Sequence, residues 1–290
     1  MNDYILRVSC DGLVVFAGSL PKVCNEASYR HSCSPTAAAA LGRTMIATAL
    51  YAETMKNDEN ISVRISGDGP LGNIIATADA DGNIRGYAQH ADMNIAPLAP
   101  GKLNVGGLVG SGGNIYVSRY SPSTGKTFTG AAELVNGEIG DDFANYLHKS
   151  EQIASAVGLG VWINPDNTIT TAGGFLVMAL PGCSEHILEI LESNIAKMCG
   201  VTDILLSANN SVQALIKALL MGINYHITAT KNVHFKCNCD DQRIKLVLNS
   251  LSTDDLEHLL ATDDTEMICH FCNEKYIVAR EDIIKIIASK

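Results

Sequence analysis

Two close pairs of cysteines near the C-terminal end of the chain constrain its fold more than any other sequence feature. The pairs are Cys237-x-Cys239 and Cys269-x-x-Cys272, and 29 residues separate them. A tetrahedral zinc site needs such an arrangement, because each pair supplies two neighbouring corners and the intervening segment folds back to join them. The sequence therefore predicts one Zn²⁺ per chain, bound by four thiolates.

Histidines near these pairs leave an alternative open, since zinc sites with three cysteines and one histidine exist. His234 precedes Cys237 by three residues and is the more plausible substitute, whereas His270 lies inside the second pair and is expected to point away from the metal. Four buried cysteines without a metal are a further, weaker alternative. The site with four thiolates remains the simplest interpretation.

The remaining cysteines bear on the cellular compartment. The chain has nine cysteines, and an odd number cannot be fully paired within one chain. The N-terminal residues lack the basic region and apolar run of a signal peptide, and the apolar stretch Ala37–Met55 carries Arg43 and Glu53. We therefore expect a cytoplasmic protein with reduced thiols. Five cysteines are expected to be buried small hydrophobic residues: Cys10, Cys24, Cys33, Cys183 and Cys199.

The charge of the chain argues against two classes of partner. With 31 acidic and 21 basic side chains the formal net charge is -10. A field of that sign repels nucleic-acid phosphates and anionic membrane surfaces, so we expect neither as a partner. Acidic residues also outnumber basic ones within residues 233–290. A static zinc ribbon that binds nucleic acid is therefore the weaker interpretation of the cysteine pattern.

Residues 1–180 are predicted to form an α+β core domain. A helix is expected from Pro35 to Met55, because Ser34 can cap it and proline fits its first position. A second helix is expected over Asp141–His148. Glycine-containing turns separate runs that are typical of short strands. These runs are Tyr4–Val8, Leu13–Phe16, Ile61–Ile65, Ile74–Thr77, Ile84–Tyr87, Ile115–Ser118, Gly158–Ile163 and Gly174–Met178.

Residues 181–232 are predicted to form a helical linker segment, and residues 233–290 a small zinc-binding domain. Ser184 and Ser211 each open an amphipathic run in the linker, and apolar stripes of this kind normally bury against a core. In the last segment helices are expected over Asp240–Ser250 and Ser252–Ala261, with short strands on either side of the second cysteine pair. The fold class is therefore α+β.

Zinc-bound thiolates suggest a redox mechanism. Zinc keeps the sulfurs deprotonated, and oxidants convert paired thiolates into disulfides, each of which removes two ligands. Cys269 and Cys272 are well spaced for this, whereas Cys237 and Cys239 would close a small, strained ring. We expect a unit of this size to depend on its metal for folding. A redox-controlled fold switch and a static zinc site both remain open from the residues alone.

The chain resembles the heat-shock protein 33 family of redox-regulated chaperones over its whole length. In that family Cys-x-Cys, a spacer of about thirty residues and Cys-x-x-Cys follow one another, as they do at positions 237, 239, 269 and 272. Further matching segments occur in the same order: His31–Ala37, Ala40–Arg43, Gly69–Gly72, Ala78–Asp79, Arg85–Tyr87, Tyr146, Ser150–Ile153 and Ala172–Phe175.

The resemblance implies an ATP-independent holdase and not an enzyme, with no catalytic or cofactor-binding residues. It implies an inactive reduced state with zinc bound. Oxidation would form the disulfides Cys237–Cys239 and Cys269–Cys272 and release zinc, after which the last two segments loosen and capture unfolding client proteins. The oxidised form is expected to be a homodimer. Asp240 and Asp241 stand where many family members have serine and glutamate, which bears on the stability of the switch and not on its existence.

Three other motifs in the chain suggest other functions only weakly. A thiol oxidoreductase would need Cys269-x-x-Cys272 at the start of a helix, whereas its flanks indicate a metal knuckle. The run Gly106–Gly113 lacks the Gly-Lys-Ser/Thr ending of a phosphate loop and is expected to connect two strands. His31 and Ser34 do not form part of a catalytic triad, because no order or spacing supports one, and helix capping explains Ser34.

Overall fold

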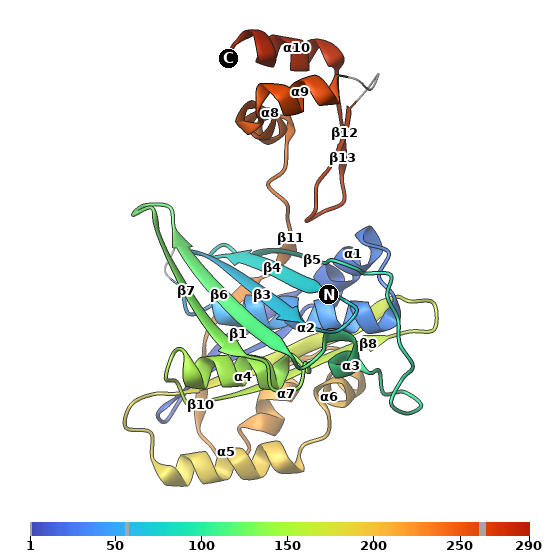
Figure 1. The fold of residues 1–290 in the computed structure, drawn as a ribbon. Coiled ribbons are helices and arrows are strands. Elements are labelled where there is room, and N and C mark those ends of the chain that lie inside the picture. The colour runs from blue at the N-terminus through green and yellow to red at the C-terminus, as the bar shows by residue number, and fades with distance from the viewer. Residues whose placement is uncertain (1, 56–57, 261–264) are drawn as a thin grey trace. The chain divides into compact units, whose positions relative to one another are not determined.

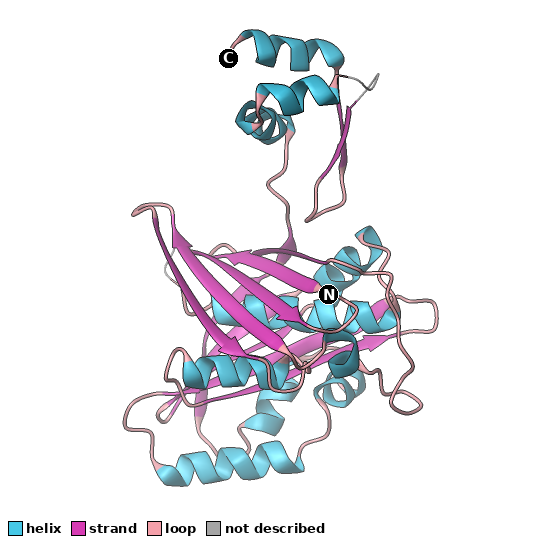
Figure 2. Cartoon of the chain, viewed as in Figure 1, coloured by secondary structure: helices cyan, strands magenta, loops and turns pink. Residues whose placement is uncertain are grey.

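The computed structural model describes residues 2–55, 58–260 and 265–290. The chain forms two compact units, Met1–Lys236 and Cys237–Lys290, which are called unit 1 and unit 2 below. Unit 1 contains two β-sheets and seven helices among its described residues, and unit 2 contains three helices and a two-stranded sheet among its own (Figures 1 and 2). The α+β fold class predicted from the sequence is confirmed.

The six-stranded sheet of unit 1 is antiparallel except at one edge. The short edge strand β11 pairs with β5 in parallel, and β7 forms the other edge. In spatial order the strands are β11 (His234–Phe235), β5 (Asn83–Ala88), β4 (Asn73–Asp79), β3 (Asn60–Gly67), β6 (Gly113–Ser121) and β7 (Lys126–Glu133). Buried and more exposed residues alternate along β3, β4 and β5, as expected for strands with one face on a core.

The five-stranded sheet of unit 1 is antiparallel throughout. In spatial order its strands are β10 (Tyr225–Asn232), β1 (Tyr4–Cys10), β2 (Leu13–Ser19), β9 (Ile169–Ala179) and β8 (Ser155–Ile163). Most of β9 is buried, because both faces of the sheet are covered near its centre. The sheet therefore separates two apolar clusters of unit 1.

Helix α2 (Pro35–Ala52) lies between the two sheets and forms the centre of the main core (Figure 1). All its residues except Pro35 and Arg43 are buried. The Ser34 hydroxyl accepts a hydrogen bond from the Ala37 N–H at 3.2 Å, so the predicted cap is confirmed. The other helices of this part are α1 (Pro21–Arg30), α3 (Val105–Val109) and α4 (Gly140–Lys149).

Three helices cover the opposite face of the five-stranded sheet and form the second cluster of unit 1. They are α5 (Glu185–Lys197), α6 (Val201–Ser207) and α7 (Val212–Leu219). The apolar stripe that begins after Ser211 is buried against the sheet, with Val212, Leu215 and Ile216 fully inaccessible to solvent. The interpretation of this stripe as a core-facing surface is confirmed.

Unit 2 has a much smaller apolar core. It contains α8 (Asp241–Ser250), α9 (Thr253–Leu259), β12 (Thr265–Ile268), β13 (Lys275–Val278) and α10 (Arg280–Ala288). Ser252 caps α9 by accepting a hydrogen bond from the Asp255 N–H at 3.1 Å. Among the described residues, the buried side chains of this cluster are those of Leu248, Leu256, Val278 and Ile283.

The structure differs from the sequence prediction in several places. The segment predicted as helical to residue 232 ends in strand β10, because its threonine- and isoleucine-containing run pairs with the edge of β1. Strand β11 belongs to a sheet of unit 1, although the last segment was expected to begin at residue 233. Strand β7 and helices α1, α6 and α10 were not predicted. Ala261, the expected end of a helix, lies outside the described residues.

Among the residues that the structure describes, no helix combines the length and the apolar character needed to cross a membrane.

Candidate metal centre

Two turns of unit 2 carry the four cysteines predicted to bind zinc. Cys237 and Cys239 precede α8, whose first residues are fixed by Asp240, because its carboxylate accepts a hydrogen bond from the Arg243 N–H at 2.7 Å. Cys269 and Cys272 lie in the turn that joins β12 to β13. The predicted strands on either side of the second pair are therefore confirmed.

The turn between β12 and β13 is closed by backbone hydrogen bonds. The Cys269 N–H donates to the Glu274 carbonyl at 3.0 Å, and the Asn273 N–H donates to the Cys269 carbonyl at 2.8 Å. Asn273 has a φ of 56°, a left-handed conformation that asparagine tolerates better than most residues. This tight knuckle brings the side chains of Cys269 and Cys272 together.

The four sulfur atoms lie within 4.8 Å of one another. The Sγ atoms of Cys237 and Cys269 are 3.7 Å apart, and those of Cys239 and Cys272 are 3.1 Å apart. In a tetrahedral zinc site with Zn–S bonds of about 2.3 Å, the sulfurs stand about 3.8 Å apart. The spacing and the all-sulfur donor set therefore fit a single metal ion.

Burial affects the protonation of two of these thiols, Cys239 and Cys272, in the absence of a cation. Cys272 is only 4% exposed, and burial raises the pKa of both Cys272 and Cys239 above the ordinary value of a thiol. A hydrogen bond with Cys239 raises the pKa of the Tyr276 hydroxyl. A bound cation would lower the pKa of these thiols instead, because it stabilises the thiolate form directly.

Neither histidine near the cysteine pairs joins the group of sulfur atoms. Within the described ranges the potential metal ligands brought together are Cys237, Cys239, Cys269 and Cys272. His234 is part of strand β11 in unit 1, and His270 lies in the knuckle without contributing to the group. The geometry therefore favours four sulfur ligands over three sulfurs and one nitrogen.

The position of the second pair also disfavours a thiol oxidoreductase. The low pKa of an attacking thiol in that class comes from a helix N-terminus or a neighbouring positive charge. Cys269 and Cys272 instead lie in a hairpin turn, and burial raises the pKa of Cys272.

The five cysteines of unit 1 divide into three kinds. Cys24 and Cys33 are buried, as expected, and burial raises the pKa of Cys33 to about 12. Cys10 and Cys183 are half-buried. Cys199 is exposed in the loop between α5 and α6, so its expected role as a buried hydrophobic residue is wrong.

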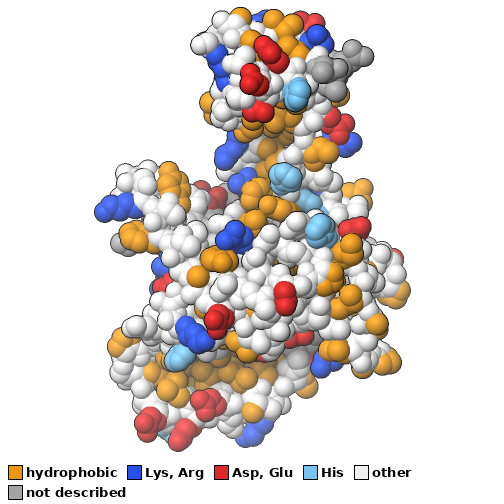
Figure 3. Space-filling model, viewed as in Figure 1, with side chains coloured by type: hydrophobic (Ala, Val, Ile, Leu, Met, Phe, Trp, Pro, Cys, Tyr) orange, Lys and Arg blue, Asp and Glu red, His pale blue; other side chains and the backbone are white. Residues whose placement is uncertain are grey.

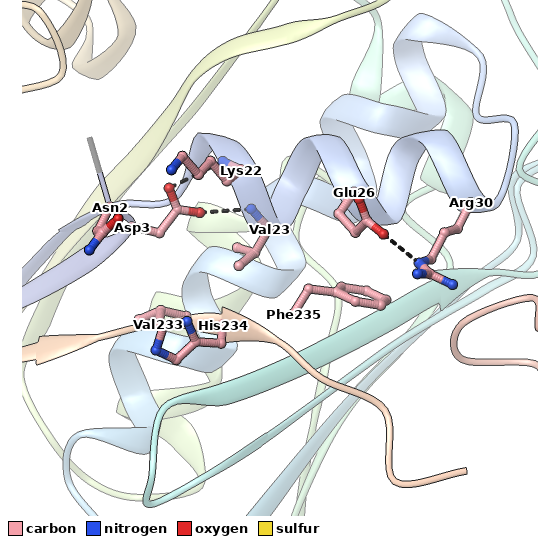
Figure 4. A pocket seen from close by; sticks show the side chains of 9 residues that line it. All are labelled: Asn2, Asp3, Lys22, Val23, Glu26, Arg30, Val233, His234 and Phe235. Carbon is pink, nitrogen blue, oxygen red and sulfur yellow. Dashed lines mark hydrogen bonds and ion pairs between the residues drawn. The ribbon is translucent and has the colours of Figure 1, made fainter. Parts of the chain in front are cut away.

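A cavity of about 350 Å³ lies in unit 1 between α1 and the segment that contains β11 (Figure 4). Its charged groups serve the local structure. The Asp3 carboxylate accepts hydrogen bonds from the Lys22 and Val23 N–H groups at the start of α1, and burial raises its pKa. Glu26 pairs with Arg30 at 2.7 Å. The cavity therefore offers no obvious ligand site.

The glycine-rich run lies in a connection between two strands, and Tyr276 interacts with one of the four cysteines. Residues 106–113 connect β5 to β6, as expected, but they contribute to the short helix α3, which is capped by Asn104. The interaction of Tyr276 with Cys239 was not predicted, because nothing in the cysteine spacing marks a tyrosine on β13 as a neighbour of the site.

Comparisons with known proteins agree over the whole chain. A family model described as Hsp33 protein matches residues 3–279. The chain is 38% identical over 290 residues to the 33 kDa chaperonin of Desulforamulus reducens, with 99% of this chain and 98% of that relative covered. It is 35% identical over 284 residues to the 33 kDa chaperonin of Bacillus subtilis, with 97% of each covered.

A solved structure has the same architecture. The crystal structure of the 33 kDa chaperonin (heat shock protein 33 homolog) from Thermotoga maritima matches this one with a TM-score of 0.90 at 26% sequence identity. The match covers 100% of this chain and 99% of that one.

Proposed function

The chain belongs to the Hsp33 family, and from that premise we propose that it is a redox-regulated, ATP-independent chaperone that holds unfolding proteins. The observation that carries the proposal is the cluster of four cysteine sulfurs in a unit with a very small apolar core. From this combination we infer that unit 2 is folded only while a metal joins the two turns that carry the cysteines.

In the reduced state, Cys237, Cys239, Cys269 and Cys272 would hold one Zn²⁺. Four sulfur donors suit Zn²⁺, and when bound it would cross-link the start of unit 2 to the knuckle between β12 and β13. The thiols would lose their protons on binding, so the four sulfurs become the thiolates that oxidants attack.

Oxidation would then close two disulfides, Cys237–Cys239 and Cys269–Cys272. With hydrogen peroxide as the oxidant, a thiolate attacks one peroxide oxygen and yields a sulfenic acid and hydroxide. The neighbouring thiolate attacks that sulfur and expels a second hydroxide. Each disulfide thus consumes two thiolates and one peroxide, and it removes two sulfur ligands from the site. The site would therefore lose its affinity for the metal.

Loss of the metal would unfold unit 2, because few buried apolar side chains remain to hold it. Both units already expose hydrophobic side chains between charged ones on the face that Figure 3 draws. In unit 2 the exposed ones include Leu246, Ile277 and Ile284. Loosening of the helices α5–α7 would add the apolar surface that they bury against the five-stranded sheet.

The proposed partners are unfolding client proteins and, in the oxidised state, a second copy of the chain. The protein would act in the cytoplasm, where thiols rest in the reduced state, and it would bind neither nucleic acid nor membrane. It would perform no catalysis, because capture of clients needs an apolar surface and no chemical step.

The proposal is tested by following the thermal aggregation of a client protein by light scattering, without ATP. Peroxide-treated protein should suppress aggregation, whereas reduced, zinc-loaded protein should not. The variant Cys199→Ser serves as a control, because that exposed thiol lies outside the proposed switch. Equal activity in both states would contradict redox regulation.

The disulfide pairing is tested by peptide mapping of the oxidised protein under non-reducing conditions. We expect links between Cys237 and Cys239 and between Cys269 and Cys272. The shorter sulfur separations in the structure join Cys237 to Cys269 and Cys239 to Cys272. Peptides linked in that second way would overturn the proposed pairing but not the proposal that the four reduced cysteines bind a metal.

A further inference from the structure

Two half-buried cysteines of unit 1, which the proposed switch does not use, contact the same hairpin turn. Cys10 ends β1, and Cys183 lies between β9 and α5. The Sγ atom of Cys10 is 3.8 Å from the carbonyl oxygen of Leu13, and the Sγ atom of Cys183 is 3.8 Å from the carbonyl oxygen of Asp11. Two thiols that are far apart in the sequence thus contact the same turn between β1 and β2.

The backbone around Cys183 packs directly on this turn. Gly12 has a φ of +74°, and a Cβ atom on it would stand 2.8 Å from the Cα atom of Cys183. The Leu180 N–H donates to the Gly12 carbonyl at 2.8 Å, and the Cys183 N–H donates to the Leu180 carbonyl at 3.1 Å. This close approach therefore depends on a glycine in the turn and is fixed by backbone hydrogen bonds.

The two side chains also lie on the same side of the five-stranded sheet. Leu6 and Val8 on β1 face the cluster formed with α5–α7, and Cys10 follows them in the two-residue alternation. Cys183 packs against the same cluster from the start of the helical layer. Burial raises the pKa of Cys10 to about 11, and the charges of Asp11 and Cys183 add to the rise.

We propose that Cys10 and Cys183 form a second oxidant-sensitive disulfide, which links the β1–β2 turn to the start of α5. Hydrogen peroxide is the oxidant. The Cys183 thiol loses its proton as its sulfur attacks one peroxide oxygen and the O–O bond breaks. A sulfenic acid remains on Cys183, and the released hydroxide leaves with that proton as water. The Cys10 sulfur then attacks the Cys183 sulfur, and the Cys10 proton leaves with the sulfenic hydroxyl as water. Two thiols and one peroxide give one disulfide and two waters.

The chemistry assigns different roles to the two cysteines. Burial raises the pKa of Cys10, so Cys10 keeps its proton at neutral pH and is poorly suited to the first attack. Both residues are half-buried, which leaves them accessible to a small oxidant. Cys24 and Cys33, in contrast, are buried and stay reduced.

This disulfide would anchor the helical layer at one end. Ser184 follows Cys183 directly and caps α5, since its hydroxyl accepts a hydrogen bond from the Ile187 N–H at 3.4 Å. A covalent link at Cys183 therefore holds the first turn of α5 near the sheet under oxidising conditions. Only this consequence rests on the proposed function, in which α5–α7 loosen; the disulfide itself does not depend on chaperone activity.

The test uses the full-length, zinc-loaded protein treated with hydrogen peroxide. Free thiols are then blocked with iodoacetamide, and the protein is digested without reductant for mass spectrometry. We expect a linked peptide pair that contains Cys10 and Cys183, two hydrogens lighter than the sum of the two peptides, and lost on reduction. Cys183→Ser should abolish it, whereas the matched control Cys199→Ser should keep it.

Alkylated Cys10 and Cys183, recovered under conditions that oxidise the four cysteines of unit 2, would overturn the proposal. A link between Cys183 and Cys199 would also overturn it. Because the same map reports both sets of cysteines, failure of this pair is distinguishable from failure of the proposed switch. Hydrogen exchange adds a second readout: the first turn of α5 should exchange more slowly in oxidised wild type than in oxidised Cys10→Ser, and equal exchange would contradict the anchoring role.

Discussion

Unit 1 and unit 2 both fold around apolar side chains, but they differ in how much of their stability those side chains can supply. Unit 1 buries a long helix between two sheets and a second apolar cluster beneath α5–α7. The main cluster of unit 2 has few buried side chains among the described residues, and they come from α8, α9, β13 and α10. We therefore expect unit 2 to depend on a further cross-link to remain folded.

The thiols of the two units reflect the same difference. In unit 1, Cys24 and Cys33 are packed among apolar residues and keep their protons, because burial raises their pKa. In unit 2, four sulfurs gather at one point, where a cation can replace their protons. Cysteine thus serves as a core residue in unit 1, and in unit 2 it would contribute to folding through a bound metal.

Removal of the metal should produce the largest difference in stability between the two units. Structural zinc sites contribute about 10–16 kcal/mol of apparent binding free energy, which greatly exceeds what the core of unit 2 can replace. Cys272→Ser, or a strong chelator, should abolish stoichiometric zinc binding and the hydrogen-exchange protection of residues 237–290, while unit 1 keeps its protection. Cys199→Ser is the control. If unit 2 stayed protected from hydrogen exchange in metal-free Cys272→Ser, its folding would not depend on the metal.

A matched pair of cavity variants should show whether the stability of each unit depends on zinc. Leu256→Ala in unit 2 and Ile216→Ala in unit 1 each remove a fully buried side chain, at a cost of about 2–5 kcal/mol. Since folding of unit 2 is coupled to zinc binding, Leu256→Ala should weaken zinc affinity at least about thirtyfold. Ile216→Ala should lower the unfolding free energy of unit 1 and leave zinc affinity unchanged. Equal zinc affinity in both variants would show that unit 2 folds without its metal.

The buried Cys33 thiol should give unit 1 an alkaline pH dependence. The pKa of Cys33 is raised to about 12 in the folded state, so its contribution to stability is fully present below the unfolded pKa of about 9. The contribution is lost as the pH rises through the folded value. The unfolding free energy of wild type should therefore fall relative to Cys33→Ala by about 1.4 kcal/mol per pH unit between these values. Parallel pH profiles in urea titrations would argue against a protonated buried thiol.

The smallest expected effect concerns the cap of α2. Ser34→Ala removes the acceptor for the Ala37 N–H and should cost about 1 kcal/mol. Thermal unfolding should show the loss in unit 1 only, with zinc stoichiometry unchanged, and Ser34→Asp should recover most of it. A change in zinc binding would mean that the stabilities of the two units are coupled.

Local rules predicted those parts of the molecule in which neighbouring residues decide the structure. The cysteine spacing predicted the four residues that come together, and Ser34 with Pro35 predicted the start of α2. Strands β7 and β10 escaped prediction, because both are exposed edge strands without the alternation that one buried face imposes. Their conformation is set by pairing with β6 and β1, and such partners are not visible in a local pattern.

Two features of the cysteines depended on tertiary structure in the same way. The exposure of Cys199 follows from its place in the loop between α5 and α6. The placement of Cys10 and Cys183 at the same turn follows from the packing of the Cys183 loop on Gly12. Neither feature is encoded in the spacing of the cysteines. The exposure of Cys199 depends on how the helices around it pack, and Cys10 and Cys183 lie in distant parts of the sequence.

The most direct test of the central claim follows zinc and folding in one sample during peroxide treatment. Zinc release is recorded with a chromogenic chelator, and hydrogen exchange is measured by mass spectrometry at the same time points. We predict that loss of one zinc per chain and loss of protection in residues 237–290 proceed together, while the core around α2 stays protected. Persistent protection of residues 237–290 after the zinc has been released would contradict the account.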